Sequence, residues 1–246
     1  MQAIYRPKGA ALEYAPLALN LYRGCTHACS YCYCPGMLRV RREAFHSGVS
    51  LRPGILEQVE RDADKLDGTE RVHLCFSCDP YPPIECDLRA TRAALRMLGS
   101  NKIPASVLTK AGYWVSRDFD LLAEMDATFG VSLVWADDER RAEHEPFAAP
   151  VADRLALLRT AKIRGLKTWA SVEPVIDPVQ ALAAIDLLLP HADVIKVGRW
   201  NHAAEANRLD WRAFAIEVQR RLEAAGKSYL LKRGLAELVP PAGAAR

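Results

Sequence analysis

Short apolar runs alternate with amphipathic segments along most of the chain, and this rhythm limits the fold more than any single motif does. The runs have strand length and are rich in β-branched residues, and they occupy 71–77, 105–110, 129–135, 167–172 and 193–198, after a first candidate strand, "LALNLYRG", at 17–24. The segments between and after them carry leucine, alanine and isoleucine three and four residues apart, at 53–66, 86–98, 117–126, 150–164, 178–189 and 210–225.

This alternation predicts an α/β fold in which helices cover a parallel sheet. Strands that are apolar throughout are typical of parallel sheets, because crossover helices bury both faces. Six strand–helix units fit a partial (β/α)6 TIM-type barrel, with an open doubly wound sheet as the alternative. Residues typical of helix starts (Asp118, Asp177, Asp210) and of helix ends (Gly165, Gly226) support these limits.

Composition and charge narrow the class of protein. A chain of 246 residues, 50% hydrophobic, can bury one core, so we expect a single domain over 1–238 and a flexible tail over 239–246. A net charge of +3 argues against a general polyanion-binding protein. Glu13, Pro16 and Asn20 interrupt the apolar content of the N-terminal segment, which predicts neither a secretory signal nor a membrane span, so we expect a cytoplasmic protein with reduced cysteines.

The segment "GCTHACSYC" (24–32) places three cysteines, Cys25, Cys29 and Cys32, in the spacing C-x3-C-x2-C. A disulfide would use two of them and leave the third, so the pattern favours a metal site. Structural zinc takes four ligands, and the fourth would be Cys34 or His27. Iron–sulfur clusters also favour thiolate ligands, and three thiolates from one tight loop leave one metal position open for chemistry.

Polar and aromatic residues gather where the predicted strands end. Loops at the carboxyl ends of parallel strands build the active site in folds of this class. Here those loops are the cysteine segment, "CDPYPPIE" (78–85), "KAGYW" (110–114), "EPVID" (173–177) and "RWNH" (199–202).

With Tyr31 just before the last cysteine, in a loop after the first predicted strand, the motif resembles that of the radical SAM superfamily. The order of "NLYRGCTHACSYCY", "SCDPYPPIE", "SVLTK", "ASVEPVID" and "VGRWNH" is similar to its spore photoproduct lyase-like (DNA repair photolyase-like) branch. The resemblance implies a [4Fe-4S] cluster on Cys25, Cys29 and Cys32, with S-adenosyl-L-methionine on the fourth iron. It also implies a flavodoxin- or ferredoxin-type electron donor and a 5′-deoxyadenosyl radical that abstracts hydrogen from a substrate.

The same resemblance implies roles for residues at the strand ends. Tyr31 would pack on the adenine, Asp79 would face the methionine amino group, and Lys110 would bind the methionine carboxylate. Three further residues would contact the ribose: Ser132, Ser171 and Glu173. Each has a plainer interpretation, such as a core aromatic for Tyr31 or an Asp-Pro turn at Asp79.

Two further cysteines are candidates for a hydrogen donor. Cys78 begins the loop after the second strand of the predicted barrel, so its thiol can return a hydrogen atom to a product radical, and Cys75, inside the strand, is the weaker candidate. We interpret Cys34 as a packed thiol near the cluster. Asn201 and His202 follow the sixth strand and are expected to face the substrate.

The resemblance points to a nucleobase in nucleic acid, or a modified nucleotide, as the substrate of a lyase, isomerase or base-modifying enzyme. Basic residues at 39–43 and at Lys227, Lys232 and Arg233 could hold phosphates. One alternative is the same chemistry on a peptide or a small metabolite. Another is a zinc-stabilised nucleic-acid-binding protein or a ferredoxin-like electron-transfer protein, which requires a fourth metal ligand.

Overall fold

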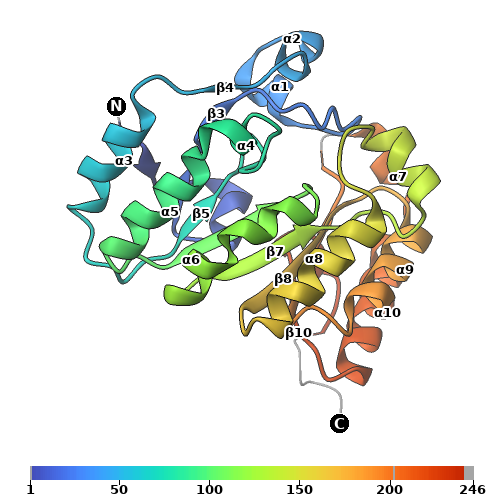
Figure 1. The fold of residues 1–246 in the computed structure, drawn as a ribbon. Coiled ribbons are helices and arrows are strands. Elements are labelled where there is room, and N and C mark those ends of the chain that lie inside the picture. The colour runs from blue at the N-terminus through green and yellow to red at the C-terminus, as the bar shows by residue number, and fades with distance from the viewer. Residues whose placement is uncertain (1, 202, 241–246) are drawn as a thin grey trace.

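An eight-stranded sheet runs through the computed structural model, which describes residues 2–201 and 203–240 (Figure 1). The first strand pairs antiparallel with the second, and every later pair is parallel. In spatial order the strands are β1 (Ile4–Tyr5), β2 (Leu17–Leu19), β5 (Val72–Leu74), β6 (Ala105–Thr109), β7 (Thr128–Ser132), β8 (Lys167–Val175), β9 (Val194–Arg199) and β10 (Ser228–Leu231). A separate antiparallel pair consists of β3 (Tyr22–Arg23) and β4 (Ser50–Leu51).

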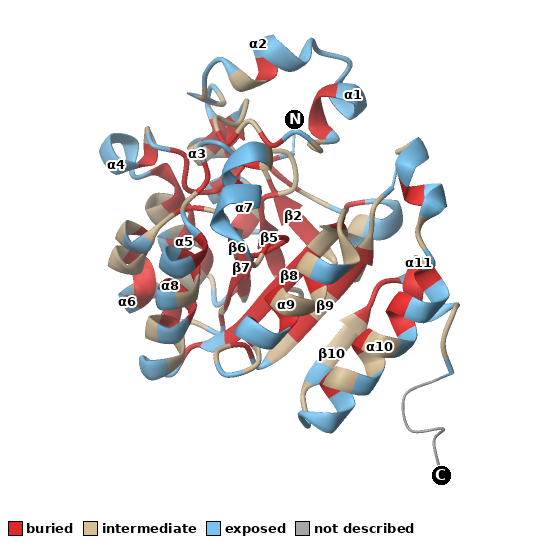
Figure 2. Cartoon of the chain, turned by 90° about the vertical axis from the view of Figure 1, so that its right-hand side faces the viewer, coloured by how far each residue is buried: buried red, intermediate tan, exposed pale blue. Residues whose placement is uncertain are grey.

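Helices follow the parallel strands and pack on the outside of the sheet (Figure 2). The helices of the outer layer are α3 (Ile55–Ala63), α5 (Ala90–Ser100), α6 (Phe119–Glu124), α8 (Val151–Ile163), α9 (Pro178–Leu188) and α10 (Trp211–Ala224). Short helices are α1 (Cys34–Leu38), α2 (Arg42–His46), α4 (Glu85–Leu88), α7 (Asp138–His144) and α11 (Arg233–Ala236), with 3-10 turns η1 (Gly9–Glu13), η2 (Tyr113–Asp118) and η3 (Ala204–Arg208). Across the described residues, no helix is long and apolar enough to span a membrane.

The sheet confirms the predicted partial barrel. The six predicted strands are present and lie side by side in chain order, as successive right-handed crossovers require. Within the described residues the sheet ends at β1 and β10, which do not pair with each other, so the barrel is open. The last strand was not predicted, because "SYLL" is short and only Leu231 in it is buried. The predicted single domain over 1–238 stays a prediction, and 241–246 of the predicted tail lie outside the described residues.

The helix limits were predicted less well than the strands. The segment expected as one helix at 86–98 is divided between α4 and α5 at Arg89, whose φ is 50°. Asp118 does not cap a helix with its side chain, because its carboxylate accepts a bond from Arg92 at 2.8 Å instead. Asp177 and Asp210 do cap α9 and α10 as expected.

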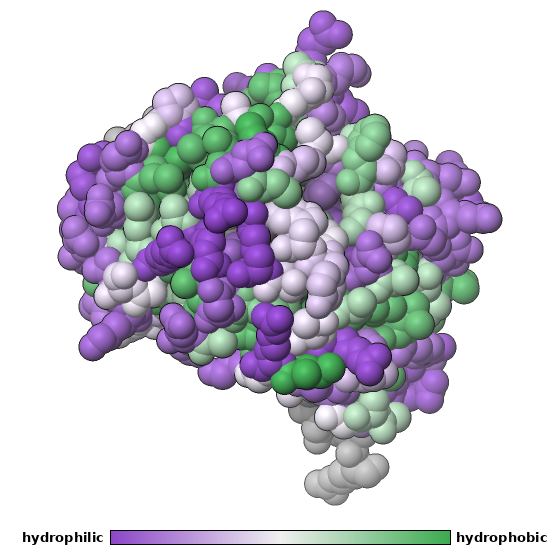
Figure 3. All heavy atoms as spheres, in the orientation of Figure 1, coloured by the Kyte–Doolittle hydropathy of each residue, from purple (hydrophilic) through white to green (hydrophobic). Residues whose placement is uncertain are grey.

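The two faces of the parallel sheet differ in polarity. Every second residue of the central strands lies under the outer helices and is fully buried, as at Val107, Val131, Ala170, Val172, Ile195 and Val197. The residues between them face the concave side, where polar groups gather: His73, Ser106, Ser132, Ser171, Glu173 and Lys196. The strands are therefore apolar on one face only, and the concave face is free to hold polar ligands. On the face drawn in Figure 3, hydrophilic residues alternate with hydrophobic patches.

Two glycines let large side chains lie close against the concave face. A β-carbon on Gly130 would lie 2.5 Å from the indole of Trp169, and one on Gly198 would lie 2.5 Å from the carboxyl carbon of Glu173. Real β-carbons do not approach other atoms so closely, so these side chains occupy their places only because both residues are glycine.

We predict that Gly198→Ala lowers the free energy of unfolding by about 1–3 kcal/mol, because the new methyl group must displace Glu173. The matched control is Gly36→Ala within α1, where an added β-carbon would meet nothing within 4 Å among the described atoms, so a small gain in stability is expected. Urea unfolding followed by circular dichroism measures both variants. Equal stability of the two variants would contradict the close packing of Glu173.

Candidate functional site

The cysteine loop lies between β3 and α1, and α2 holds its backbone. The guanidinium of Arg42 donates to the carbonyls of Cys29 at 3.0 Å and of Cys32 at 2.8 Å. The ring of His46 contacts the carbonyl of Cys25 through Nδ1 at 2.8 Å. All three cysteines are free thiols, and Cys29 is the buried one. Side chains from α2 therefore fix the backbone at each of the three predicted metal ligands.

Asp79 connects this loop to the ends of β5 and β6. Its Oδ1 accepts bonds from the backbone N–H of Tyr81 at 2.8 Å and from Thr109 Oγ1 at 2.7 Å. Its Oδ2 accepts the backbone N–H of Lys110 at 2.8 Å and lies 2.9 Å from Nε2 of His27, in the cysteine loop. Burial acts to raise the pKa of Asp79, but His27 and the other donors outweigh it and hold that pKa below its usual value. The predicted contact of Asp79 with methionine stays a prediction, and in the structure its carboxylate anchors the cysteine loop.

Three of the predicted cofactor residues meet around one buried ion pair. Lys110 Nζ donates to Ser132 Oγ at 3.0 Å and lies 3.8 Å from Oε1 of Glu145. The hydroxyl of Tyr31 donates to the same Glu145 oxygen. The other oxygen of Glu145 lies 2.6 Å from Nη2 of Arg154, and both of these side chains are fully buried.

Sequence reasoning missed Glu145 and Arg154. A charged residue on a helix is usually solvated, but Arg154 lies on the buried stripe of α8 formed by Val151, Leu157, Leu158 and Ala161. An arginine at such a position needs a buried partner, because an unpaired charge there is costly. The position of Arg154 in line with the apolar residues of α8 was therefore the signal in the sequence. Glu145 has no such pattern around it.

The segment from His144 to Phe147 is hydrogen-bonded directly to the cysteine loop. Ser30 donates its backbone N–H to the carbonyl of His144 at 2.8 Å, and its hydroxyl lies 2.9 Å from Nδ1 of the same histidine. His27 Nδ1 contacts the carbonyl of Phe147 at 3.1 Å, and the backbone N–H of Phe147 returns to the carbonyl of His27. Figure 1 shows α7, which leads into this segment, at the same end of the molecule as α1 and α2.

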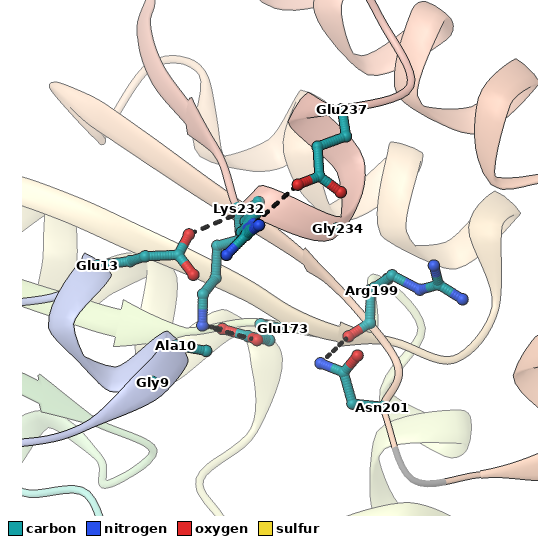
Figure 4. A pocket seen from close by; sticks show the side chains of 10 residues that line it. Gly9, Ala10, Glu13, Glu173, Arg199, Asn201, Lys232, Gly234 and Glu237 are labelled. Atoms are coloured by element: carbon teal, nitrogen blue, oxygen red, sulfur yellow. Dashed lines mark hydrogen bonds and ion pairs between the residues drawn. The ribbon is translucent and has the colours of Figure 1, made fainter.

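Ser171 and Glu173 lie together on β8, one strand away from Ser132. The hydroxyl of Tyr14 contacts Ser171 Oγ at 3.0 Å and donates to Glu173. Lys232 Nζ lies 3.0 Å from each oxygen of Glu173 (Figure 4). A cavity of about 540 Å³ opens beside this pair, and its lining is Gly9, Ala10, Glu13, Glu173, Arg199, Asn201, Lys232, Arg233, Gly234 and Glu237. Asn201 thus lines a cavity, whereas His202 lies outside the described residues.

The remaining thiols surround the end of β5. The thiol of Cys34 donates to the carbonyl of Phe76 at 3.6 Å. The thiols of Cys75 and Cys78 are hydrogen-bonded to each other, and this contact, followed by burial, raises the pKa of Cys78 well above its usual value. Cys78 is therefore a neutral thiol that still carries its hydrogen at physiological pH.

The donor set of the loop fits an iron–sulfur cluster better than a structural zinc ion. Three free thiols on one loop are the ligands that such clusters prefer. Of the two candidates for a fourth ligand, His27 has partners at both ring nitrogens. The thiol of Cys34 contacts the thiol of Cys32 as well as the carbonyl of Phe76. Within the described residues, no three His, Cys, Asp or Glu side chains are yet gathered closely enough to hold a metal ion.

The sequence model of the radical SAM superfamily matches residues 19–183, from β2 through most of α9. The chain belongs to the radical SAM superfamily. The match includes the cysteine loop, Asp79, Lys110 and the Glu145–Arg154 pair. Membership implies S-adenosylmethionine and an iron–sulfur cluster as cofactors.

Curated relatives of this radical SAM chain carry no assigned activity. An uncharacterized protein of Methanocaldococcus jannaschii is 27% identical over 164 residues, which are 66% of this chain and 61% of the relative. An uncharacterized protein of Mycobacterium bovis is 28% identical over 185 residues, 69% of this chain and 52% of the relative. The chain thus spans between about half and three fifths of these relatives.

Solved structures share the fold at low identity. A spore photoproduct lyase variant has a TM-score of 0.71 at 14% identity, over 92% of this chain and 79% of that one. Streptococcus suis SuiB bound to S-adenosylmethionine has a TM-score of 0.67 at 15% identity, over 91% of this chain and 52% of that one. Another SuiB structure contains the precursor peptide SuiA, and another spore photoproduct lyase structure contains a dinucleoside spore photoproduct.

We predict that Arg154→Met lowers the free energy of unfolding by about 3–5 kcal/mol, because the buried Glu145 loses its close ion-pair partner and keeps only the longer contact with Lys110 and the hydroxyl of Tyr31. Adding Glu145→Gln to the same chain should recover part of that loss, since the poorly compensated charge is then removed. The exposed Arg159→Met on the same helix is the control and should stay within about 0.5 kcal/mol of the unsubstituted protein. Urea titrations measure all three, and an Arg154 variant as stable as the control would exclude this pair as an anchor.

Proposed function

We propose that this chain is a radical SAM enzyme of the lyase, isomerase or base-modifying kind, acting on a nucleobase in nucleic acid or on a modified nucleotide. Cys25, Cys29 and Cys32 would hold a [4Fe-4S] cluster. The single observation that supports this best is a loop of three free thiols whose backbone carbonyls are each held by a side chain of α2. When bound, the cluster and S-adenosylmethionine supply the 5′-deoxyadenosyl radical that abstracts a hydrogen atom.

The residues around Glu145 would bind the methionine part of the cofactor. Lys110 reaches into the site from the end of β6 and offers an ammonium group for a carboxylate, the strong kind of hydrogen bond. At 3.8 Å, Glu145 balances its charge without a direct hydrogen bond, so the ammonium keeps donors for a ligand. Tyr31, held by the same Glu145, would present its ring to the adenine.

The concave ends of β7 and β8 would bind the ribose. Ser132 and Ser171 are paired neighbours in the sheet and carry hydroxyls on the same face. Glu173, held between Tyr14 and Lys232, would accept hydrogen bonds from ribose hydroxyls. Asp79 would mainly hold the cysteine loop in place. We also propose that its carboxylate contacts the methionine amino group of the cofactor.

Cys78 would return a hydrogen atom to the product radical. Its thiol is protonated and partly exposed, and it lies at the carboxyl end of β5. Cys75, hydrogen-bonded to it, is buried, so it would support Cys78 and is the weaker donor candidate.

The aromatic groups Tyr14, Phe76 and Trp169 on the concave side favour a flat nucleobase over a peptide. A peptide or small metabolite remains the second candidate, because SuiB, a structural neighbour, was solved with a precursor peptide. A zinc site that uses His27 as fourth ligand is disfavoured, because both ring nitrogens of His27 are engaged. A zinc-stabilised or ferredoxin-like protein would have to use Cys34, and the Cys34→Ala variant described below tests that alternative. We further propose a cytoplasmic location, which keeps the thiols reduced, and a flavodoxin- or ferredoxin-type electron donor.

The deciding experiment measures iron, sulfide and zinc in anaerobically reconstituted protein, together with 5′-deoxyadenosine release under dithionite. We predict about four irons per chain and nucleoside release, both lost in the triple variant Cys25→Ala, Cys29→Ala, Cys32→Ala. Cys34→Ala and the exposed Cys86→Ala serve as controls and should retain both. Zinc in place of iron, or a complete cluster without cleavage, would refute the proposal.

A second prediction concerns Lys110. Lys110→Met should weaken binding of S-adenosylmethionine by about 10- to 100-fold, because a charge-assisted hydrogen bond contributes about 1.5–3 kcal/mol. Equilibrium dialysis with labelled cofactor on reconstituted protein measures this, and the exposed Lys102→Met is the matched control. Unchanged binding with an intact cluster would remove Lys110 from the cofactor site.

A further inference from the structure

Four rings form a contiguous aromatic cluster on the concave side of the sheet. Tyr14 contacts His73 at 5.5 Å, Phe76 at 5.8 Å and Trp169 at 5.8 Å between ring centroids. His73 also contacts Phe76 at 4.5 Å and Trp169 at 6.0 Å. The cluster joins residues from η1, β5 and β8 with the loop after β5, so it is assembled by the fold and not by one segment.

Lys196 points its ammonium group at this cluster. It pairs in register with Ser171 of the neighbouring strand, and its Nζ lies 4.9 Å from the ring centre of Tyr14 and 4.6 Å from that of Trp169. Among the described residues these ring contacts are its only close interactions, and the side chain is half-buried. Burial, with the nearby charge of Lys232, lowers the pKa of Lys196 to about 8, as expected for an ammonium group without an anionic partner.

Lys232 and His73 add no free charge to this face. Lys232, whose Nζ lies 4.6 Å from the same Tyr14 ring, is paired with both oxygens of Glu173. His73 is neutral, because burial lowers its pKa to about 3. The carboxylates of Glu13 and Glu173 attract the Lys196 ammonium, but less strongly than burial and Lys232 oppose its charge, and within the described residues neither carboxylate forms an ion pair with it.

Two almost fully buried side chains in the cluster also lack hydrogen-bond partners. His73 is 1% exposed and Trp169 is 3% exposed, yet Nε2 of the first and Nε1 of the second have no partner among the described atoms. Buried polar atoms in native proteins are nearly always bonded. Unpaired polar groups of this kind destabilise a fold unless a ligand pairs with them. Together with the unpaired ammonium, they therefore fit a binding site for a polar ligand.

We propose that Lys196 binds an oxyanion of the substrate, a phosphate ester or a carboxylate, while the rings of Tyr14 and Trp169 contact the flat part of the same molecule. The identity of this ligand as the substrate rests on the proposed function, but the binding site does not. The cavity of about 540 Å³ bounded by Glu173 and Lys232 has a volume typical of small-molecule sites. Lys196 and the four rings do not line it, and Lys232, which contacts the Tyr14 ring, separates it from the cluster. Lys196 lies on β9, whereas Lys110, the residue proposed to bind the cofactor, follows β6 on the same concave face.

The test is calorimetric titration of the purified protein, without any turnover, with three probes. Thymidine 5′-monophosphate carries a phosphate beside a flat base, benzoate carries a carboxylate on a ring, and thymidine has no charge. The unsubstituted protein should bind at least one charged probe about tenfold more tightly than thymidine, and Lys196→Met should abolish that difference. Lys102→Met is the control and should behave like the unsubstituted protein. Preference for the phosphate or for the carboxylate identifies the kind of oxyanion.

Thermal unfolding distinguishes a binding role from a structural one. If Lys196 is a ligand group, Lys196→Met should leave the Tm unchanged or raise it, because a half-buried unpaired charge is removed. Lys196→Arg should keep part of the preference for charged probes. Equal affinity of the unsubstituted protein for thymidine and for both charged probes, or unchanged charged-probe binding in Lys196→Met, would overturn the proposal. So would a large fall in Tm, which would identify Lys196 as structural.

This outcome is separable from that of the proposed function. Oxyanion binding that depends on Lys196 in a protein that never releases 5′-deoxyadenosine would keep the site and reject the radical chemistry. Nucleoside release with no oxyanion preference would reject the site and keep the chemistry.

Discussion

The carboxylate of Asp79 is the interaction on which the proposed site depends. A buried carboxylate is tolerated only when its oxygens are hydrogen-bonded, and here four donors from three parts of the chain converge on it. Through His27 it fixes the cysteine loop, and through Lys110 it fixes the end of β6. Asp79 is therefore the group that ties the cysteine loop to the end of β6, while α2 and residues 144–147 hold the loop from other sides.

The polar groups of the concave face lie in two separate parts of the sheet. Lys110, Ser132 and Tyr31 meet at β6 and β7 around the Glu145–Arg154 pair, and these are the residues proposed to bind the cofactor. The half formed by β8, β9 and β10 carries Glu173, Lys196 and, just after β10, Lys232, while the aromatic cluster reaches from Trp169 of β8 across to His73 of β5. Because the outer face is apolar and covered by helices, polar groups could accumulate only on the concave side.

Sequence reasoning predicted the parallel sheet and the order of its six strands from strand-length apolar runs, whereas it was the resemblance to the family that assigned Tyr31, Lys110 and Ser132 to one cofactor site. It missed β10, in which only Leu231 is buried. It missed the segment from His144 to Phe147, which includes Glu145. The contacts that make this segment important are with residues about 114 to 120 positions away in the sequence. It placed Asp79 at the right loop but could not reveal its four donors, which come from tertiary structure.

The hydrogen bonds from His144 and Phe147 to the cysteine loop join segments that lie far apart in the sequence. Residues near position 30 cannot take up their final positions until β7 and α8, more than a hundred residues later, have formed and brought this segment to them. Contacts of such sequence separation form late, because a long stretch of chain must first be ordered. The thiols thus keep their supported arrangement only while residues 27–30 and 144–147 are held together, so the cysteine motif is not a self-contained metal-binding unit.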